Sequence, residues 1–330
     1  MTKEHINKVF ESFKNKNILI IGDVMLDAYI WGSVERISPE APVPIVSISK
    51  RETRLGGAAN VALNIKAMGA NPIICSVVGN DERAEVFISL LKKREMTKTG
   101  IVIDENRPTT TKTRVISNNQ HLLRIDEETT EYISKQTEDK LLEKYISIIN
   151  TQKIDSIIFQ DYNKGVLTAS LIENAINEAN KKGIQISVDP KKQNFEAYKN
   201  VNLFKPNFSE FIDGLKINIA KDDIKNIFKA SKQLKEKINA TNVLISLSEL
   251  GVFISDGNLY HHILSEIRDI TDVSGAGDTV IAVATLCFVS GMDLKDIAIL
   301  SNLAGGLVCE KAGVVHVNKK ELLESYLKNN

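Results

Sequence analysis

The sequence carries no excess of charge of either sign. Its 330 residues contain 42 Lys and Arg against 42 Asp and Glu, which gives a formal net charge of +0 at pH 7. A chain without a net positive field has no general attraction for nucleic acid or for an anionic membrane surface. We therefore expect neither nucleic acid nor a membrane as a partner.

Long apolar runs and paired cysteines are also missing. No apolar stretch approaches the roughly 18 residues that span a membrane, and residues 1–17 lack the apolar centre of a signal peptide. The three cysteines, Cys75, Cys287 and Cys309, stand among apolar neighbours, with no CxxC pair and no nearby His at metal-ligand spacing. We expect a cytoplasmic protein whose thiols are reduced core residues.

Linkers rich in Pro, Gly or Ser and fixed-period repeats are absent too, which argues against a second independent domain. The chain instead alternates short apolar runs with helical patterns. NILIIGD (17–23), NPIICSVVG (71–79) and IQISVD (184–189) are typical of buried parallel strands. Strands that alternate with helices predict parallel pairing with right-handed crossovers. The expected fold is an α/β, three-layer, doubly wound sheet that spans residues 1–330 as one domain.

Two segments interrupt this alternation. Residues 28–54 hold short β-branched runs broken by SPEAPVP (38–44), whose prolines exclude a helix. RPTTTKTRVISNNQHLLRID (107–126) has two alternating runs around Asn118 and Asn119, which predicts an antiparallel hairpin. We expect these segments, about 28–54 and 102–127, to form a small β-lid.

The string DVSGAGDTV (272–280) stands directly before an apolar helix and is the strongest indication of chemistry. Gly275, Ala276 and Gly277 would direct free backbone N–H groups outward at the positive end of the helix, which makes an anion hole. Asp278 would lie in the first turn, where its carboxylate can take the proton of a substrate hydroxyl. The alternative role for Asp278 is that of a helix cap.

DVSGAGD resembles the C-terminal signature of the ribokinase-like (PfkB) carbohydrate kinases. RLGGAANVALNIKAMGA (54–70) resembles the second signature of that family. The resemblance implies a ribokinase-like fold and phosphoryl transfer from Mg-ATP to a sugar. It also implies that Gly56 and Gly57 let the sugar lie against the backbone and that Asn60 offers an amide.

A closer resemblance covers nearly the whole chain. GDVMLD (22–27), RISPEAPVP (36–44), TKTRV (111–115), DYNKG (161–165), DPK (189–191) and KPNFSE (205–210) are similar to the kinase domain of heptose-7-phosphate kinases. This implies ATP-dependent phosphorylation of the anomeric hydroxyl of D-glycero-D-manno-heptose 7-phosphate to heptose 1,7-bisphosphate, for the lipopolysaccharide core precursor. Bifunctional members carry a nucleotidyltransferase domain with an HxGH motif, which this chain lacks. We therefore expect a separate nucleotidyltransferase to act downstream.

Several polar residues are candidate sugar ligands. Asp23 and Asp27 follow the first strand and could accept hydrogen bonds from sugar hydroxyls, although Asp is also common in turns. Asp161 and Lys164 end a later strand at the same expected edge. A phosphate on the substrate needs cations to hold it, and the lid offers three. These cations are Lys112, Arg114 and Arg124. Alternatively, they could form the solvent-exposed face of a hairpin.

The nucleotide site follows from the family resemblance. Asn207 and Glu210 resemble an NxxE element that organises magnesium and phosphates, with Phe208 and Ser209 between them; a helix cap is the alternative. SLSELG (246–251) resembles a nucleotide-binding run in which Leu247 replaces a cation. The further nucleotide ligands implied are Ser246, Ser248, Glu249, Gly251 and Asn302.

Other readings stay open. A related kinase could act on ribose or a fructose phosphate, and a sugar-binding regulatory module could keep the fold without turnover. The intact GAGD string counts against a pure binding protein, because binding needs no base. A homodimer through the β-lid is a further expectation.

Overall fold

A computed structural model describes residues 2–118, 120–266 and 268–329. Its central sheet has the strand order β13-β12-β11-β10-β9-β8-β1-β4-β5. All neighbours from β5 to β11 are parallel, whereas β12 and β13 are antiparallel additions at one edge. The strands are β1 (Asn17–Gly22), β4 (Asn71–Gly79), β5 (Gly100–Asp104), β8 (Ser156–Gln160), β9 (Gln185–Asp189), β10 (Leu203–Phe204), β11 (Asn242–Ser246), β12 (Val252–Ser255) and β13 (Tyr260–Ile263).

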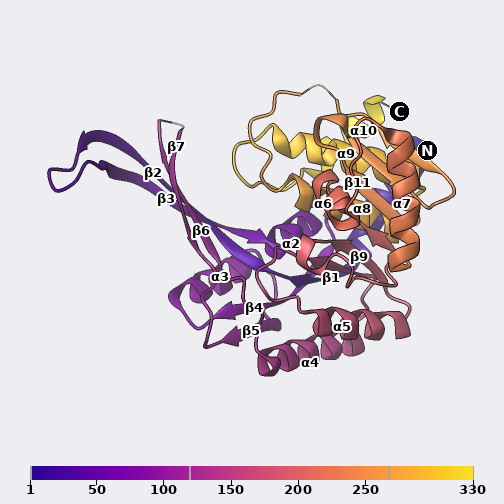
Figure 1. The fold of residues 1–330 in the computed structure, drawn as a ribbon, viewed down its shortest axis with the longest axis horizontal. Helices are drawn as coiled ribbons and strands as arrows, with labels where there is room; N and C mark the ends of the chain where they lie inside the picture. Colours follow the sequence, from indigo (N-terminus) through magenta and orange to yellow (C-terminus); the bar gives the residue numbers. More distant parts are fainter. Residues whose placement is uncertain (1, 119, 267, 330) are drawn as a thin grey trace.

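Helices cover both faces of this sheet (Figure 1). One core includes side chains of α1 (Lys3–Ser12), α2 (Ala58–Ala67), α3 (Glu82–Lys93), α8 (Ala276–Val289), α9 (Leu294–Cys309) and α10 (Lys319–Asn329). The opposite core includes side chains of α4 (Lys135–Thr151), α5 (Ala169–Lys181), α6 (Phe208–Leu215) and α7 (Ile224–Ile238). Ile20 and Ile21, adjacent in β1, enter different cores. Burial on both faces explains why the strand sequence is continuously apolar, and the three-layer α/β prediction is confirmed.

The lid is a separate four-stranded sheet with the order β3-β2-β6-β7. Its strands are β2 (Val24–Ile37), β3 (Pro44–Gly57), β6 (Thr111–Ser117) and β7 (Gln120–Glu127), and the β2–β3 hairpin projects from the body (Figure 1). The second lid segment begins at Thr111 and not near residue 102, because β5 pairs with β4 in the central sheet. The predicted hairpin turn includes Asn119, which lies outside the described residues.

All three cysteines are buried and free, as expected. Among the described residues no helix has the length and apolar character needed to cross a membrane. The carboxyl ends of the parallel strands lie at one edge of the sheet, where α/β folds bind ligands. Asp23, Asp161 and Lys205 directly follow β1, β8 and β10, and Asp189 is the last residue of β9. The fold therefore brings their side chains to that edge.

Candidate active site

The N-terminus of α8 forms the centre of the site. Gly275 is its N-cap, with a φ of 80° and a ψ of 1°, a left-handed conformation that glycine adopts without strain. A Cβ at Gly275 would lie 2.8 Å from Asn60 Nδ2, so a larger residue would collide with Asn60. The first helical turn presents unpaired backbone N–H groups and partial positive charge. Gly275, Ala276 and Gly277 can therefore bind an anion beside Asp278.

The carboxylate of Asp278 is held by donors from separate parts of the chain. Asn60 Nδ2 donates to Oδ2 at 2.8 Å, and the Tyr162 hydroxyl donates to Oδ1 at 2.6 Å. Gln160 Nε2 lies 3.2 Å from Oδ1 and also 3.2 Å from Asp189 Oδ2. These donors orient the carboxylate. Asp278 does not cap α8, because the N-cap is Gly275 and no side chain makes a capping hydrogen bond there.

Burial raises the pKa of Asp278 from 3.8 to about 6, because only 3% of the residue is exposed. The hydrogen bonds from Tyr162 and Asn60 oppose this rise, while the nearby Asp189 adds to it and Lys205 opposes it. A carboxyl group with this pKa is ionised near neutral pH and is a stronger base than an exposed Asp.

A cavity of about 200 Å³ opens beside Asp278 and contains two lysines. Lys205 Nζ forms a salt bridge with Asp189 Oδ2 at 3.1 Å, and both side chains are almost fully buried. Lys191 forms an ion pair with Glu210. The cavity is lined by Tyr162, Asp189, Lys191, Lys205, Asn207, Glu210, Ser246, Gly275, Gly277 and Asp278. Cations beside a helix N-terminus suit a phosphoryl group.

Asn207 and Glu210 form a capping box at the start of α6, so the capping alternative is confirmed. Asn207 Oδ1 accepts from Glu210 N at 2.8 Å, and Glu210 Oε2 accepts from Asn207 N at 2.8 Å. The other carboxylate oxygen, Oε1, contacts Lys191. The box aims Glu210 at the cavity while stabilising the helix, and therefore leaves its predicted role at the phosphates open.

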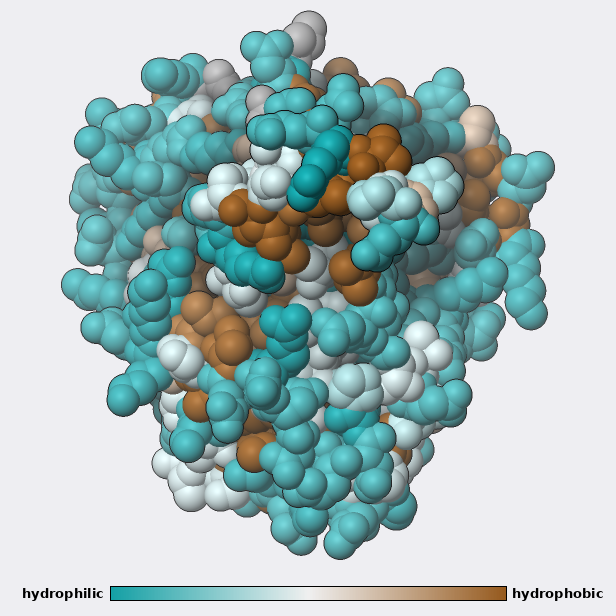
Figure 2. Space-filling view, turned by 90° about the vertical axis from the view of Figure 1, so that its left-hand side faces the viewer, coloured by the Kyte–Doolittle hydropathy of each residue, from teal (hydrophilic) through white to brown (hydrophobic). Residues whose placement is uncertain are grey.

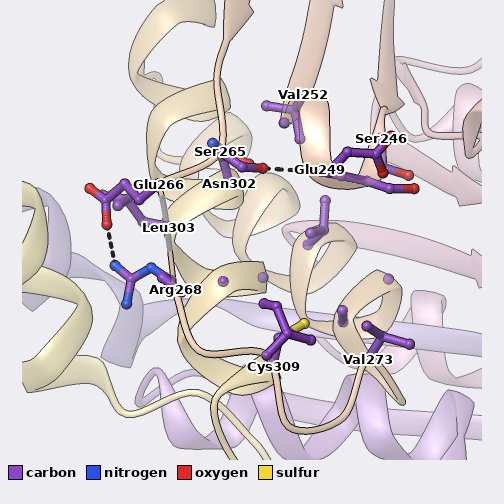
Figure 3. A pocket seen from close by; sticks show the side chains of 18 residues that line it. Ser246, Glu249, Val252, Ser265, Glu266, Arg268, Val273, Asn302, Leu303 and Cys309 are labelled. Carbon is purple, nitrogen blue, oxygen red and sulfur yellow. Dashed lines mark hydrogen bonds and ion pairs between the residues drawn. The ribbon is translucent and has the colours of Figure 1, made fainter. Parts of the chain in front are cut away.

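Figure 3 shows a second cavity, of about 640 Å³. Ser246 and Gly277 line both this cavity and the first one. Its walls come from the β11–β12 turn, the segment after β13, the first turns of α8, and α9. Polar groups stand among apolar walls, as in small-molecule sites. It is lined by the predicted nucleotide residues Ser246, Ser248, Glu249, Gly251 and Asn302, and by Val252, Ser265, Glu266, Arg268, Ile270, Val273, Ala276, Gly277, Val280, Leu303, Gly305, Gly306 and Cys309.

Neither cavity is lined by Leu247, Phe208 or Ser209, although each stands beside lining residues in the sequence. Leu247 is fully buried in the core. Phe208 packs against the same core, and Ser209 lines neither cavity described above. Asn302 is positioned by its Nδ2, which donates to the carbonyl of Leu264 at 2.8 Å. Of the expected nucleotide set, Phe208 and Ser209 are thus the members that the cavities do not include.

Asp27 lies at the base of the lid. Arg114 NH1 donates to Asp27 Oδ1 at 2.6 Å. A Cβ at Gly56 would lie 2.2 Å from Asp27 Oδ2, and one at Gly57 would lie 2.4 Å from the carbonyl of Asp23. Both glycines are therefore needed where the lid meets α2, whatever they contact in a complex.

Acidic neighbours also engage the lid cations Lys112 and Arg124, and Lys164 in the loop after β8. Lys112 Nζ contacts Asp126 at 3.0 Å and Glu128 at 2.7 Å. Lys164 Nζ contacts Glu128 at 2.6 Å, and the exposed Arg124 contacts Asp126 at 3.0 Å. A phosphate group would have to compete with these carboxylates for the same donors.

Asp23 and Asp161 are both buried and hold the loop that carries Tyr162. The carboxylate of Asp23 accepts from the backbone N–H groups of Tyr162, Lys164 and Val166 at 2.8–3.1 Å. Burial and then the neighbouring Asp161 raise the pKa of Asp23 to about 6. Asp161 accepts from the Tyr198 hydroxyl at 2.8 Å. The structure thus gives both residues a positioning function, and their expected sugar contacts stay predictions.

Five residues at the centre were not singled out from the sequence. They are Gln160, Tyr162, Asp189, Lys191 and Lys205. Four of them lie within the quoted motifs DYNKG, DPK and KPNFSE, and all five lie at or just after the ends of parallel strands. Their position at the strand ends could thus have identified these residues from the sequence, because polar residues at the ends of parallel strands share one edge of the sheet.

The profile of the pfkB family carbohydrate kinases matches residues 15–321. The chain is 40% identical over 308 residues to the bifunctional protein HldE of Helicobacter pylori, with 93% of this chain and 65% of that protein covered. It is 40% identical over 318 residues to the protein of that name from Sulfurimonas denitrificans, with 96% and 65% covered. The chain thus spans about 65% of the length of these relatives.

Solved structures share the fold. Escherichia coli phosphofructokinase-2 in complex with potassium has a TM-score of 0.78 at 19% identity, over 95% of this chain and 99% of that one. Arabidopsis thaliana ribokinase complexed with ribose and ATP has a TM-score of 0.72 at 15% identity, over 94% and 99%. At these identities the likeness concerns the fold alone, and it confirms the expected ribokinase-like architecture.

The hydrogen bond from Tyr162 generates a prediction about pH. The Tyr162 hydroxyl stabilises the ionised form of Asp278, so Tyr162→Phe should raise the pKa of Asp278 above about 6. In a plot of kcat/KM for phosphoryl transfer against pH, the fall at low pH (the acid limb) should move to higher pH by about one pH unit.

The control variant is Tyr132→Phe, whose hydroxyl contacts Asn194 instead. It should leave the acid limb in place. An acid limb that does not move in Tyr162→Phe would mean that Asp278 is not the group that titrates.

Proposed function

Because the chain belongs to the pfkB family of carbohydrate kinases, we propose that it phosphorylates D-glycero-D-manno-heptose 7-phosphate at its anomeric hydroxyl. ATP supplies the phosphoryl group, and the products are heptose 1,7-bisphosphate and ADP. The observation that carries the choice of heptose is the 40% identity to HldE proteins over 93% of the chain. The motifs quoted from the sequence agree with it.

The relatives are named bifunctional, and the chain spans about 65% of their length. We therefore assign only the kinase step to these residues. A nucleotidyltransferase step would follow on the route to the lipopolysaccharide core heptose, and both steps would take place in the cytoplasm, where ATP is available.

The site supports a direct transfer. In the proposed reaction Asp278 takes the proton from the anomeric hydroxyl while the sugar oxygen forms a bond to the terminal phosphorus of ATP. The bond between that phosphorus and the bridging oxygen breaks, and ADP leaves. The Gly275–Gly277 amides and Lys205 would stabilise the charge on the transferred group. A covalent enzyme intermediate is not needed.

Magnesium would be held mainly by the nucleotide. No cluster of three or more His, Cys, Asp or Glu side chains suited to a metal exists among the described residues. Glu210 and Asn207 both line the cavity, which fits an indirect contact with magnesium through water. When bound with ATP, magnesium neutralises phosphate charge.

The cations of the lid are an argument for a phosphorylated substrate. Lys112, Arg114 and Arg124 lie on β6 and β7, and Asp27 lies opposite Lys112 in the register of β2 and β6. A closed lid would also exclude water and so protect ATP from hydrolysis. The carboxylates that already engage these cations favour a second candidate, a kinase of the same family for a sugar without this phosphate.

A substrate panel separates the two candidates. We expect the wild-type protein to prefer heptose 7-phosphate over unphosphorylated heptose, ribose and fructose 6-phosphate. Arg114→Ala should raise KM for heptose 7-phosphate by roughly ten- to a hundredfold, because a charge-assisted bond is lost. KM for ATP and for unphosphorylated heptose should change little.

The matched control is Arg51→Ala. Arg51 pairs with Ile30, whereas Arg114 pairs with Tyr29, so alternation places the two arginines on opposite faces of the lid. If the wild-type protein prefers an unphosphorylated sugar, the heptose 7-phosphate assignment is wrong and the second candidate replaces it.

The lid also supports the proposed homodimer. β7 is an edge strand whose eight residues are all exposed, including Leu123 at 53% and Ile125 at 46%. Exposed edge strands tend to be covered by another chain. Figure 2 views the molecule from the side to which the lid projects, and apolar side chains gather on the upper middle of this face. A solved relative, phosphofructokinase-2 from Escherichia coli, has a tetrameric inhibited form.

Sedimentation can test this assembly. The wild-type protein should sediment as a dimer, and Ile125→Glu should shift it to a monomer because a buried carboxylate would be unpaired. The control Ile103→Glu alters another exposed isoleucine, on β5 of the central sheet, and should remain dimeric. A monomeric wild-type protein would contradict the proposal.

A further inference from the structure

Lys191 occupies a central position that the mechanism above leaves without a function. Its ammonium group contacts Oε1 of Glu210 and lies 5.7 Å from the ring centroid of Tyr162. The Tyr162 hydroxyl in turn donates to Asp278. Lys191 therefore stands between the base and the capping box of α6, in the cavity that contains Gly275 and Gly277.

The two lysines of this cavity differ in how firmly they are held. The side chains of Lys205 and Asp189 are 3% and 6% exposed, so this pair is fixed within the protein. The side chain of Lys191 is 28% exposed, and that of its partner Glu210 is 11% exposed. Lys191 can thus change partners at less cost than Lys205, because its charge is only partly removed from water.

The charges of the cavity favour a second cation that can contact a bound anion. Its lining contains the carboxylates of Asp189, Glu210 and Asp278 but only two ammonium groups. A triphosphate that enters this space meets more negative than positive side-chain charge. If Lys191 stayed bound to Glu210, Lys205 alone would face the incoming anion while still bound to Asp189.

We propose that Lys191 is a catalytic residue that exchanges Glu210 for the terminal phosphate of the bound nucleotide. This inference rests on the proposed phosphoryl transfer. In the empty site Glu210 holds Lys191 in place and neutralises it. In the complex the terminal phosphate, which carries more negative charge than Glu210, replaces Glu210 as the partner of the Lys191 ammonium group. Lys191 and Lys205 then both stabilise the transferred group. The exchange frees Oε1 of Glu210, since Oε2 remains bonded to the amide of Asn207.

Removal of this cation should slow the transfer itself. Lys191→Met should lower kcat by about a hundredfold, the loss typical of a donor that stabilises transition-state charge. Lys191→Arg should recover part of this loss, because it keeps the charge. The adjacent Lys192 is the matched control: its side chain is 75% exposed and lies 3.8 Å from Asp213. Lys192→Met should retain wild-type turnover.

A double-mutant cycle separates catalysis from simple neutralisation of Glu210. If Lys191 acts on the phosphate, Lys191→Met should lower kcat by about a hundredfold in the Glu210→Gln background as well. If Lys191 only neutralises Glu210, the loss should disappear in that background, and the proposal is wrong.

Binding provides a readout that does not depend on turnover. Calorimetry should show that Lys191→Met weakens binding of a nonhydrolysable ATP analogue about tenfold and leaves ADP binding within about twofold. Equal effects on the two nucleotides would place Lys191 away from the terminal phosphate and overturn the proposal. A wild-type protein that transfers phosphate to no sugar would contradict the proposed function, whereas the binding comparison would still test Lys191.

Discussion

The structure of the site depends on one buried carboxylate. Asp278 is removed from water, and a carboxylate in that position is stable only if donors surround it. Asn60 from α2, Gln160 at the end of β8 and Tyr162 in the following loop provide these donors. Asn60 is 218 residues from Asp278 in the sequence. Asp278 therefore acquires its environment only when both halves of the fold are assembled.

Other charged groups around Asp278 also need hydrogen-bond or ion-pair partners. The loop that carries Tyr162 is held by the buried Asp23, whose carboxylate accepts three of its backbone N–H groups. Around this centre, Lys205 is paired with Asp189, Lys191 with Glu210, and Arg114 with Asp27. An anion that binds here would have to exchange partners with these cations, because acidic side chains of the protein already neutralise them.

Local signals in the sequence predicted much of this arrangement. Continuous apolar runs predicted the parallel strands, and the GAGD string predicted the start of a helix at Gly275 and the place of Asp278 in the first turn of α8. The pairs that complete the site were not predictable, since Gln160 and Asp278 lie 118 residues apart and nothing local links them. The start of the second lid segment was placed too early, because residues 102–104 belong to β5, which pairs with β4 in the central sheet.

The central claim is that Asp278 is the base of a phosphoryl transfer. The most direct measurement compares kcat of the wild-type protein with that of Asp278→Asn, together with their affinity for ADP and their thermal unfolding. The account predicts a loss of at least about a hundredfold in kcat, because the amide cannot take the proton. ADP affinity and the fold should persist, since the N–H groups of α8 remain. A variant with near wild-type kcat would contradict the account.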